Sequence, residues 1–250
     1  MAIRKRLDIL LVEKNFFITR SRARDAIVRQ AIKVNGEIIL KAGKIISDDA
    51  EIVVCDPAQN YVSRAALKLI CALDAFPIVT DKVTAIDIGT STGGFTQVLL
   101  ERGAEHIIAV DVGHNQLDAR LFGNSAITLL EGLNVRDLKQ EHLGGREIDL
   151  IVSDVSFISL KLALPPVLSL AKQGAQAVLL VKPQFEIGRE FLGKGGILRD
   201  LSKAKQTAKR LFDWLNTQKG WIAKGLLLSP ITGSDGNLEY LLFGEKKGEQ

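Results

Sequence analysis

The sequence has few of the residues that build disulfide frameworks or metal sites. It holds two cysteines, Cys55 and Cys71, and three histidines among 250 residues. Two cysteines without a second pair or a histidine cluster do not make a zinc site, and in a reducing compartment we expect both to stay as thiols. No metal site is predicted.

Long apolar runs are also absent. None approaches the roughly 18 residues of a membrane-spanning helix, and the longest, such as 175–181, have the length of a strand. The basic start is not followed by the apolar stretch of a signal peptide, because charged residues interrupt it. We therefore expect a cytoplasmic protein without a membrane partner.

Positive charge is abundant only at the start of the chain. The formal net charge is +4, but residues 1–36 hold nine Lys or Arg against three acids, which leaves −2 for the rest. Such a segment suits a polyanion such as RNA, because Arg binds phosphates through paired donors. A solvated helix face is the alternative. The candidate RNA contacts are Arg4, Arg6, Arg20, Arg22, Arg24, Arg29 and Lys33, with Arg64 further along.

The first 58 residues are predicted to form a small α+β domain. Leu7, Leu10 and Leu11 follow helical spacing, and Thr19 can cap a second helix. Asn35-Gly36 between alternating residues predicts a β-hairpin over 32–39. Residues 44–54 are expected to add a short strand region before a polar linker.

The remainder, 59–250, is predicted to be one α/β domain, with 59–82 as linker and leading helix. Short apolar runs alternate with helical stretches, which is typical of an open parallel sheet with helices on both faces. Two late runs, 221–228 and 238–243, suit an antiparallel edge. The expected strands are 83–88, 107–112, 127–130, 148–153 and 175–182, and the expected helices are 95–102, 115–122, 159–172 and 200–218.

A glycine-rich turn follows the first strand of this domain. Its G-x-x-x-G-G spacing from Gly89 to Gly94 fits neither the dinucleotide fingerprint nor a P-loop. The leading acid, Asp87, suits a ligand with an ammonium group, and S-adenosylmethionine has one. Asp111 ends the second strand, where an acid accepts hydrogen bonds from ribose hydroxyls. The candidate cofactor contacts are Asp87, Gly89, Ser91, Thr92, Gly93, Gly94, Phe95 and Asp111.

Two charged residues end later strands of the predicted sheet. Asp154 follows 149–153, and Lys182 follows four apolar residues, where a lysine is costly unless it is paired or used. A structural salt bridge explains this pair as well as catalysis does. If Lys68 and Glu239 converge on it, the set can align an acceptor hydroxyl and remove its proton. Whether Lys182 acts as the base or stabilises an alkoxide stays open.

Six motifs in order resemble the haemolysin A (TlyA-type) family of ribosomal RNA methyltransferases. They cover nearly the whole chain, which departs from the family pattern at Ala65-Ala66, Gln97 and His114-Asn115. The motifs are Tyr61-Val62-Ser63-Arg64-Ala65-Ala66-Leu67-Lys68-Leu69, Asp87 to Thr96, Val110-Asp111-Val112-Gly113, Ser153 to Leu160, Val181-Lys182-Pro183-Gln184-Phe185-Glu186 and Ser229 to Tyr240.

The resemblance implies an S4-like RNA-binding domain before an FtsJ-like, Rossmann-like methyltransferase domain with a doubly wound sheet. It also implies S-adenosylmethionine-dependent 2′-O-methylation of cytidine in ribosomal RNA, of the 16S kind, the 23S kind or both. It makes Lys68, Asp154, Lys182 and Glu239 the catalytic residues and adds Asn134 on the adenine side. A haemolysin-type cytolytic protein and a non-catalytic ribosome-binding module are the alternatives. Neither the target nucleotide nor the oligomeric state can be read from the sequence.

Overall fold

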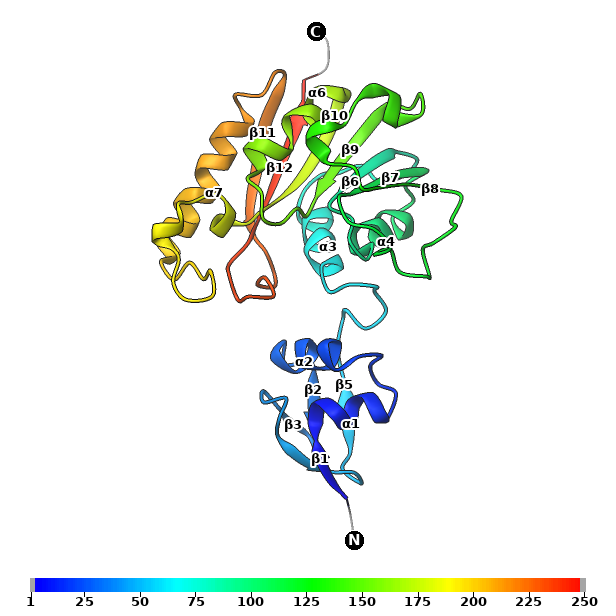
Figure 1. Cartoon of the computed structure of the whole chain (residues 1–250), viewed down its shortest axis with the longest axis vertical. Coiled ribbons are helices and arrows are strands. Elements are labelled where there is room, and N and C mark those ends of the chain that lie inside the picture. The colour runs from blue at the N-terminus through cyan, green and yellow to red at the C-terminus, as the bar shows by residue number, and fades with distance from the viewer. Residues whose placement is uncertain (1–2, 248–250) are drawn as a thin grey trace. The chain divides into compact units, whose positions relative to one another are not determined.

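The computed structural model describes residues 3–247 of the chain (Figure 1). These residues form two compact units, and the division falls between Asn60 and Tyr61. The first is a small α+β unit, and the second is built on one large sheet.

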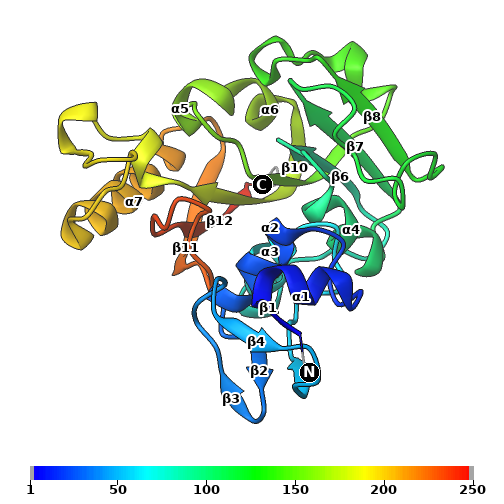
Figure 2. The ribbon, with the colours of Figure 1, turned by 60° about the horizontal axis from the view of Figure 1, so that its bottom comes forward.

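Two short helices and two small antiparallel sheets make up the first unit (Figure 2). Strand β1 pairs with β4, and β2 lies between β3 and β5. Thr19 caps the second helix as predicted, because its side chain accepts a hydrogen bond from the Arg22 amide. The elements are β1 (Arg4–Arg6), α1 (Leu7–Glu13), α2 (Arg20–Val28), β2 (Ile32–Val34), β3 (Glu37–Ile38), β4 (Ile45–Ser47) and β5 (Ile52–Val54).

The predicted hairpin connects β2 and β3. Asn35 and Gly36 have φ of 49° and 83°, the pair of positive values that a two-residue type I′ turn needs. Val34 lies opposite Glu37, so the register is set directly by the turn. The prediction from Asn-Gly is confirmed.

A seven-stranded sheet forms the centre of the second unit. Its order is β11-β12-β10-β9-β6-β7-β8. Strands β6 to β10 run parallel, and β12 pairs antiparallel with both β10 and β11, which confirms the predicted antiparallel edge. The strands are β6 (Thr84–Ile88), β7 (His106–Asp111), β8 (Ile127–Glu131), β9 (Ile148–Ser153), β10 (Ala171–Val181), β11 (Trp221–Leu228) and β12 (Tyr240–Lys246).

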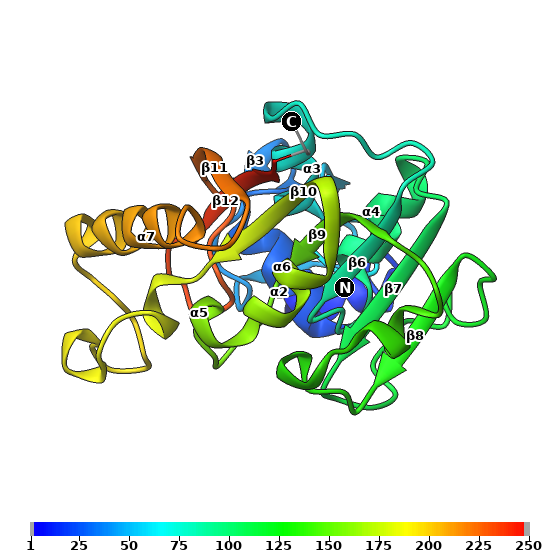
Figure 3. The ribbon, with the colours of Figure 1, turned by 90° about the horizontal axis from the view of Figure 1, so that it is seen from above.

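Helices cover both faces of this sheet (Figure 3). Alternate residues of one strand enter different cores: Ile151 packs with α5, α6 and α7, whereas Leu150 and Val152 pack with α3 and α4. The sheet is therefore buried on both sides, as apolar parallel strands require. The helices are α3 (Ala66–Ala75), α4 (Gly94–Glu101), α5 (Leu160–Ala163), α6 (Pro165–Leu170) and α7 (Leu201–Leu215), with short 3-10 turns η1 (Val135–Asp137), η2 (Gln140–Leu143), η3 (Pro183–Phe185) and η4 (Arg189–Phe191).

Two helix predictions need correction. The prediction of a helix over 115–122 was wrong, because the segment forms turns. Asn115 has φ of 55°, and the carboxylate of Asp118 accepts from the Arg120 amide at 3.0 Å, a local bond that competes with helical hydrogen bonding. The helix expected over 159–172 is divided into α5 and α6, because Pro165 and Pro166 lack the amides to continue α5 and instead begin α6.

Candidate active site

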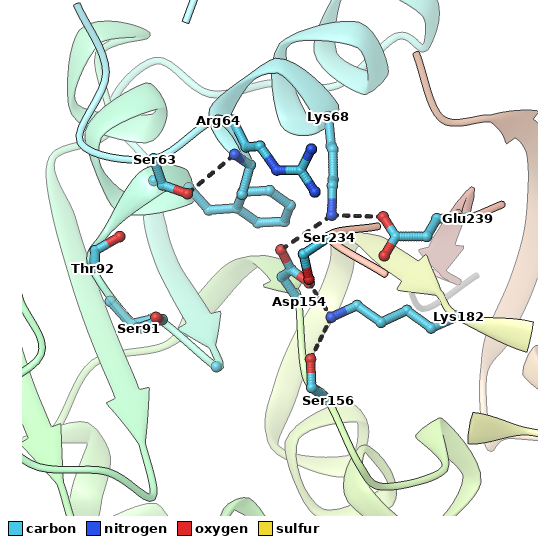
Figure 4. A pocket seen from close by; sticks show the side chains of 15 residues that line it. Ser63, Arg64, Lys68, Ser91, Thr92, Asp154, Ser156, Lys182, Ser234 and Glu239 are labelled. Carbon is cyan, nitrogen blue, oxygen red and sulfur yellow. Dashed lines mark hydrogen bonds and ion pairs between the residues drawn. The ribbon is translucent and has the colours of Figure 1, made fainter. Parts of the chain in front are cut away.

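Four charged side chains converge at the carboxyl end of the parallel sheet (Figure 4). Each comes from a different part of the second unit. Lys68 lies in the first turn of α3, Asp154 follows β9, Lys182 follows β10, and Glu239 precedes β12. The topology brings Asp154 and Lys182 together because β9 and β10 are parallel neighbours.

The four groups form a chain of alternating charge. Lys182 Nζ lies 2.6 Å from Asp154 Oδ1, and Lys68 Nζ lies 2.6 Å from Glu239 Oε2. A longer contact of 3.8 Å between Lys68 Nζ and Asp154 Oδ2 joins the two pairs. The sequence left this convergence conditional, and the structure supplies it.

The cluster is almost removed from solvent. The side chains of Lys68 and Glu239 are 6% and 3% exposed. Burial raises the pKa of the Glu239 carboxyl, and the nearby Lys68 ammonium opposes that rise. Opposite charges at hydrogen-bond distance offset the cost of burying each charge, which an isolated lysine here could not do.

Ser156 belongs to the site, although sequence reasoning did not single it out. Lys182 Nζ donates a hydrogen bond to Ser156 Oγ at 2.6 Å, in addition to its ion pair with Asp154. Its place two residues after Asp154, inside a motif already identified, was the available signal. Ser234 also lines the cavity at the cluster (Figure 4).

Two connected cavities meet at the cluster. The smaller one, of 220 Å³, contains the four charged residues and the glycine-rich turn. The larger one, of 470 Å³, runs past Asp111 and is walled by apolar side chains, namely Leu133, Val135, Phe157 and Ile158. Gly89, Ser91, Asp154 and Ser156 line both. A ligand in the larger cavity can therefore reach the charged cluster.

Glycine is needed at two points of the turn for close packing. Gly89 has φ of 82°, and a Cβ there would meet the backbone of Asp154 and Val155 at 3.1–3.2 Å. The Asp154 amide also donates to Ile88 O at 3.0 Å. Gly94 faces Ser63 and the start of α3, where a Cβ would come within 2.9 Å of Ser63 Cβ. These contacts fix Asp154 and Lys68 relative to the turn.

Two of the candidate cofactor residues lie away from both cavities. A Cβ on Gly93 would meet Leu121 and Leu117 side chains, so this glycine packs against the 115–122 segment. Asp87 is fully buried beneath the turn, and Thr96 Oγ1 donates to its carboxylate at 2.7 Å. Its other oxygen, Oδ1, is buried without a hydrogen-bond partner, so the contact of Asp87 with the ammonium group of a ligand stays a prediction. The remaining loop candidates, Ser91, Thr92 and Phe95, line the smaller cavity.

Asp111 and Asn134 both line the larger cavity. Asp111 accepts from the Ser91 and Gly113 amides, both at 2.7 Å, which fixes its carboxylate between two turns. Each carboxylate oxygen has a further lone pair for a ligand. Asn134 accepts from the Arg136 amide at 3.1 Å and begins the η1 turn.

A third cavity, of 800 Å³, also borders the cluster. Lys182 and Glu239 line it together with Ser156 and Ser234. Phe157, which is 90% exposed with φ of 64°, borders both this cavity and the one at Asp111, and its ring lies 5.1 Å from that of Phe185. The charged cluster therefore borders both ligand spaces, through Asp154 in one and through Lys182 and Glu239 in the other.

The basic side chains of the first unit differ in availability. Arg4 and Lys33 are exposed, whereas Arg22 donates long bonds to the carbonyls of Ala58 and Gln59. Arg29 is less exposed than Arg4 and Lys33, since its side chain is 12% exposed and its guanidinium pairs with Asp56 at 2.7 Å. The other three, Arg6, Arg20 and Arg24, bind one buried carboxylate.

Arg64 belongs to the second unit and to the active site. It lines the smaller cavity and donates to Thr232 O at 3.2 Å. Gln97, a departure from the family pattern, accepts from the Val62 amide at 2.8 Å and thus ties the segment before Arg64 to α4.

Residues 3–247 contain neither a cluster of metal-binding side chains nor a membrane-spanning helix. Within them no three His, Cys, Asp or Glu side chains gather as metal ligands would. Their helices are too short or too polar to traverse a bilayer.

Comparison with known protein families matches both units. Residues 61–246 fit the family described as FtsJ-like methyltransferase, and residues 5–52 fit the S4 domain. The protein named 16S/23S rRNA (cytidine-2′-O)-methyltransferase TlyA of Mycobacterium tuberculosis is 39% identical over 97% of this chain and 90% of its own length. The chain belongs to the haemolysin A (TlyA) family.

Other members of the TlyA family extend the likeness. Hemolysin A of Brachyspira hyodysenteriae is 38% identical over 94% of this chain and 98% of its own length. A solved structure titled "Putative hemolysin from Streptococcus thermophilus" is 37% identical, covers 99% of this chain and 90% of its own, and superposes with a TM-score of 0.75. The predicted fold, an S4 domain followed by a Rossmann-like methyltransferase domain, is confirmed.

The buried Asp87 should make the free energy of unfolding depend on pH. Burial raises its pKa to about 7, and the Thr96 hydroxyl opposes this rise. The unfolded chain releases this proton near pH 4, so the folded state loses stability as pH rises from about 4 to about 7, by up to about 4 kcal/mol. Asp87→Asn has no such titration. The free energy of unfolding of the variant relative to the native protein should therefore increase across this range and level off above it.

Chemical denaturation at a series of pH values measures this difference. The Asp74→Asn variant, at an exposed carboxylate paired with Arg102, is the matched control and should show no such rise. Parallel curves for Asp87→Asn and the native protein would show that Asp87 is ionised throughout.

Proposed function

We propose that this protein transfers a methyl group from S-adenosylmethionine to the 2′-hydroxyl of a cytidine in ribosomal RNA. The observation that carries the proposal is the Lys68–Glu239 and Asp154–Lys182 cluster at the junction of two ligand spaces. A methyl transfer needs a donor on one side of such a group and an acceptor on the other.

The cavity at Asp111 suits the donor. Its apolar walls can enclose an adenine, and the fixed Asp111 carboxylate can accept from both ribose hydroxyls. When bound, S-adenosylmethionine supplies an electrophilic methyl group on a sulfonium. Gly89 and Ser91, which line both smaller cavities, would direct that methyl group toward Lys182 and Asp154.

Lys182 suits the acceptor oxygen. The Lys182 ammonium forms an ion pair with Asp154 and donates a proton to Ser156 Oγ. A remaining proton can hold the oxygen of a ribose hydroxyl. This oxygen would bond to the methyl carbon as the bond from that carbon to sulfur breaks, and the hydroxyl proton would pass to solvent water. We assign Lys182 to stabilising this oxygen and Asp154 to holding Lys182 in place. Lys68 and Glu239 complete the charge balance around Asp154.

Ribosomal RNA is supported as the acceptor by the S4 domain and by the names of the TlyA relatives. The 800 Å³ cavity has room for a nucleotide, and the exposed Phe157 ring at its edge offers a surface on which a base can stack. Cytidine comes from the relatives' names alone.

Removing the Lys182 ammonium should abolish the reaction while leaving the fold intact. Lys182→Ala is expected to lower the rate of methyl transfer from labelled donor to ribosomal RNA by at least about 100-fold, because the acceptor oxygen loses its cation. Lys209→Ala removes an exposed lysine that contacts Asp213 and the Phe212 ring on its own helix, away from the cluster, and should retain the native rate. A folded Lys182→Ala variant with full activity would contradict the assigned role.

Asp111 should control donor affinity. Asp111→Asn is expected to weaken S-adenosylmethionine binding by roughly tenfold or more, because a charged acceptor is lost from the ribose hydroxyls. Isothermal titration calorimetry measures the dissociation constant, with Asp118→Asn, on the nearby loop, as the control for charge. If Asp111→Asn binds the donor like the native protein, the cavity at Asp111 is not the donor site.

A further inference from the structure

One carboxylate organises three arginines on the first unit. Asp8, in the first turn of α1, is fully buried. Its Oδ2 accepts from Arg20 Nη2 and Arg24 Nε, both at 2.9 Å, and its Oδ1 accepts from Arg6 Nε at 3.0 Å. The three arginines come from β1 and from two successive turns of α2, so a single acid joins separate elements.

Asp8 remains ionised despite its burial. Burial alone would raise its pKa, but the hydrogen bonds from Arg6, Arg20 and Arg24 outweigh this and hold the pKa well below its ordinary value. Three positive charges and one negative charge leave the cluster with a net charge of +2. Asp8 therefore lowers the net positive charge of the cluster by one, but it holds three arginine side chains in place.

The three arginine side chains stay partly exposed while Asp8 holds them. The side chains of Arg6, Arg20 and Arg24 are 43%, 49% and 52% exposed. Arg20 and Arg24 each give Asp8 one donor, and a guanidinium has five. Arg6 also packs closely against Gly43: a Cβ at that glycine would lie only 3.1–3.4 Å from the Arg6 guanidinium. Donors for a further anion therefore remain at fixed positions.

We propose that Asp8 is a positioning residue that arranges Arg6, Arg20 and Arg24 into a binding site for the phosphates of the RNA backbone. This inference rests on the proposed function, which makes RNA the substrate. A free arginine loses much side-chain freedom when it binds a phosphate. Arginines that are already fixed lose less, so the acid strengthens RNA binding although it carries the same sign of charge as RNA.

The direction in which one substitution changes RNA affinity distinguishes positioning by Asp8 from simple charge attraction. Asp8→Asn adds one net positive charge to the unit, so attraction alone predicts tighter RNA binding. Positioning predicts the opposite, a loss of roughly tenfold, because an amide offers one neutral acceptor oxygen in place of a carboxylate. Glu37→Gln is the charge-matched control, since Glu37 lies exposed on β3 and outside the cluster.

A second variant tests the cluster without removing the buried acid. Arg20→Lys keeps the charge and leaves Asp8 in place, but a lysine cannot pair with Asp8 and present a second planar edge to a phosphate. We expect it to weaken RNA binding by roughly fivefold to tenfold. A role of the cluster in folding alone would leave the affinity of this folded variant unchanged.

The experiment measures dissociation constants of the full-length chain for deproteinised bacterial ribosomal RNA by filter binding, at several salt concentrations. Thermal unfolding identifies the variants that are folded at the assay temperature. Positioning predicts weaker binding by Asp8→Asn and Arg20→Lys, native or tighter binding by Glu37→Gln, and unchanged donor binding by calorimetry in all three. For Asp8→Asn the slope of affinity against salt should not decrease, since no cation is lost.

Two results would overturn the inference. One is a folded Asp8→Asn variant that binds RNA as tightly as the native chain or more tightly. The other is native affinity in Arg20→Lys, and this decides the matter alone if Asp8→Asn does not fold. If the native chain itself does not bind ribosomal RNA, the proposed substrate is wrong, which is a different outcome from native binding with insensitive variants.

Discussion

Four ionised side chains can lie almost buried at the end of the central sheet only because they alternate in sign. Lys182, Asp154, Lys68 and Glu239 stand in that order, with 2.6 Å contacts within each pair. Loss of Asp154 or Lys68 would leave Lys182 or Glu239 charged and without its ion-pair partner in a site with little water, which is costly. The requirement explains why the surrounding backbone is so constrained: Gly89 must approach the Asp154 backbone closely, and α3 must begin beside Gly94 to deliver Lys68. The glycine-rich turn thus serves the charged cluster as much as it serves a ligand.

Much of the fold was predictable because its signals are local. The apolar strands, the Thr19 cap and the Asn35-Gly36 hairpin each depend on residues within one element, and the structure confirms them. The helix predicted over 115–122 failed because spacing was not the deciding signal there. The segment has helical spacing, but the hydrogen bond of Asp118 to the Arg120 amide and the packing of Leu117 and Leu121 over Gly93 hold it in turns. Such packing involves residues more than twenty positions away, which periodicity does not report.

The site was predictable in its members and less so in their arrangement. Polar residues at the ends of parallel strands pointed to Asp154 and Lys182, and the family motifs added Lys68 and Glu239. The sequence did not reveal how deeply each side chain is buried. Asp87 begins the glycine-rich motif but lies under the turn, and Arg29 lies among exposed arginines but is paired with Asp56. In both cases burial depends on neighbouring elements, so residue type and spacing could not reveal it. Asp8 shows the converse, because an acid in a basic segment can hold together the positive surface around it.

Mapping of 2′-O-methyl groups on ribosomal RNA, from cells with and without this protein, tests the central claim most directly. Ribose methylation protects the adjacent phosphodiester from alkaline cleavage, so each modified position is read individually. We expect at least one cytidine to lose its 2′-O-methyl group when the protein is absent and to regain it when the protein is restored. An identical set of ribose methylations in both cell types would show that this protein does not methylate ribosomal RNA in those cells.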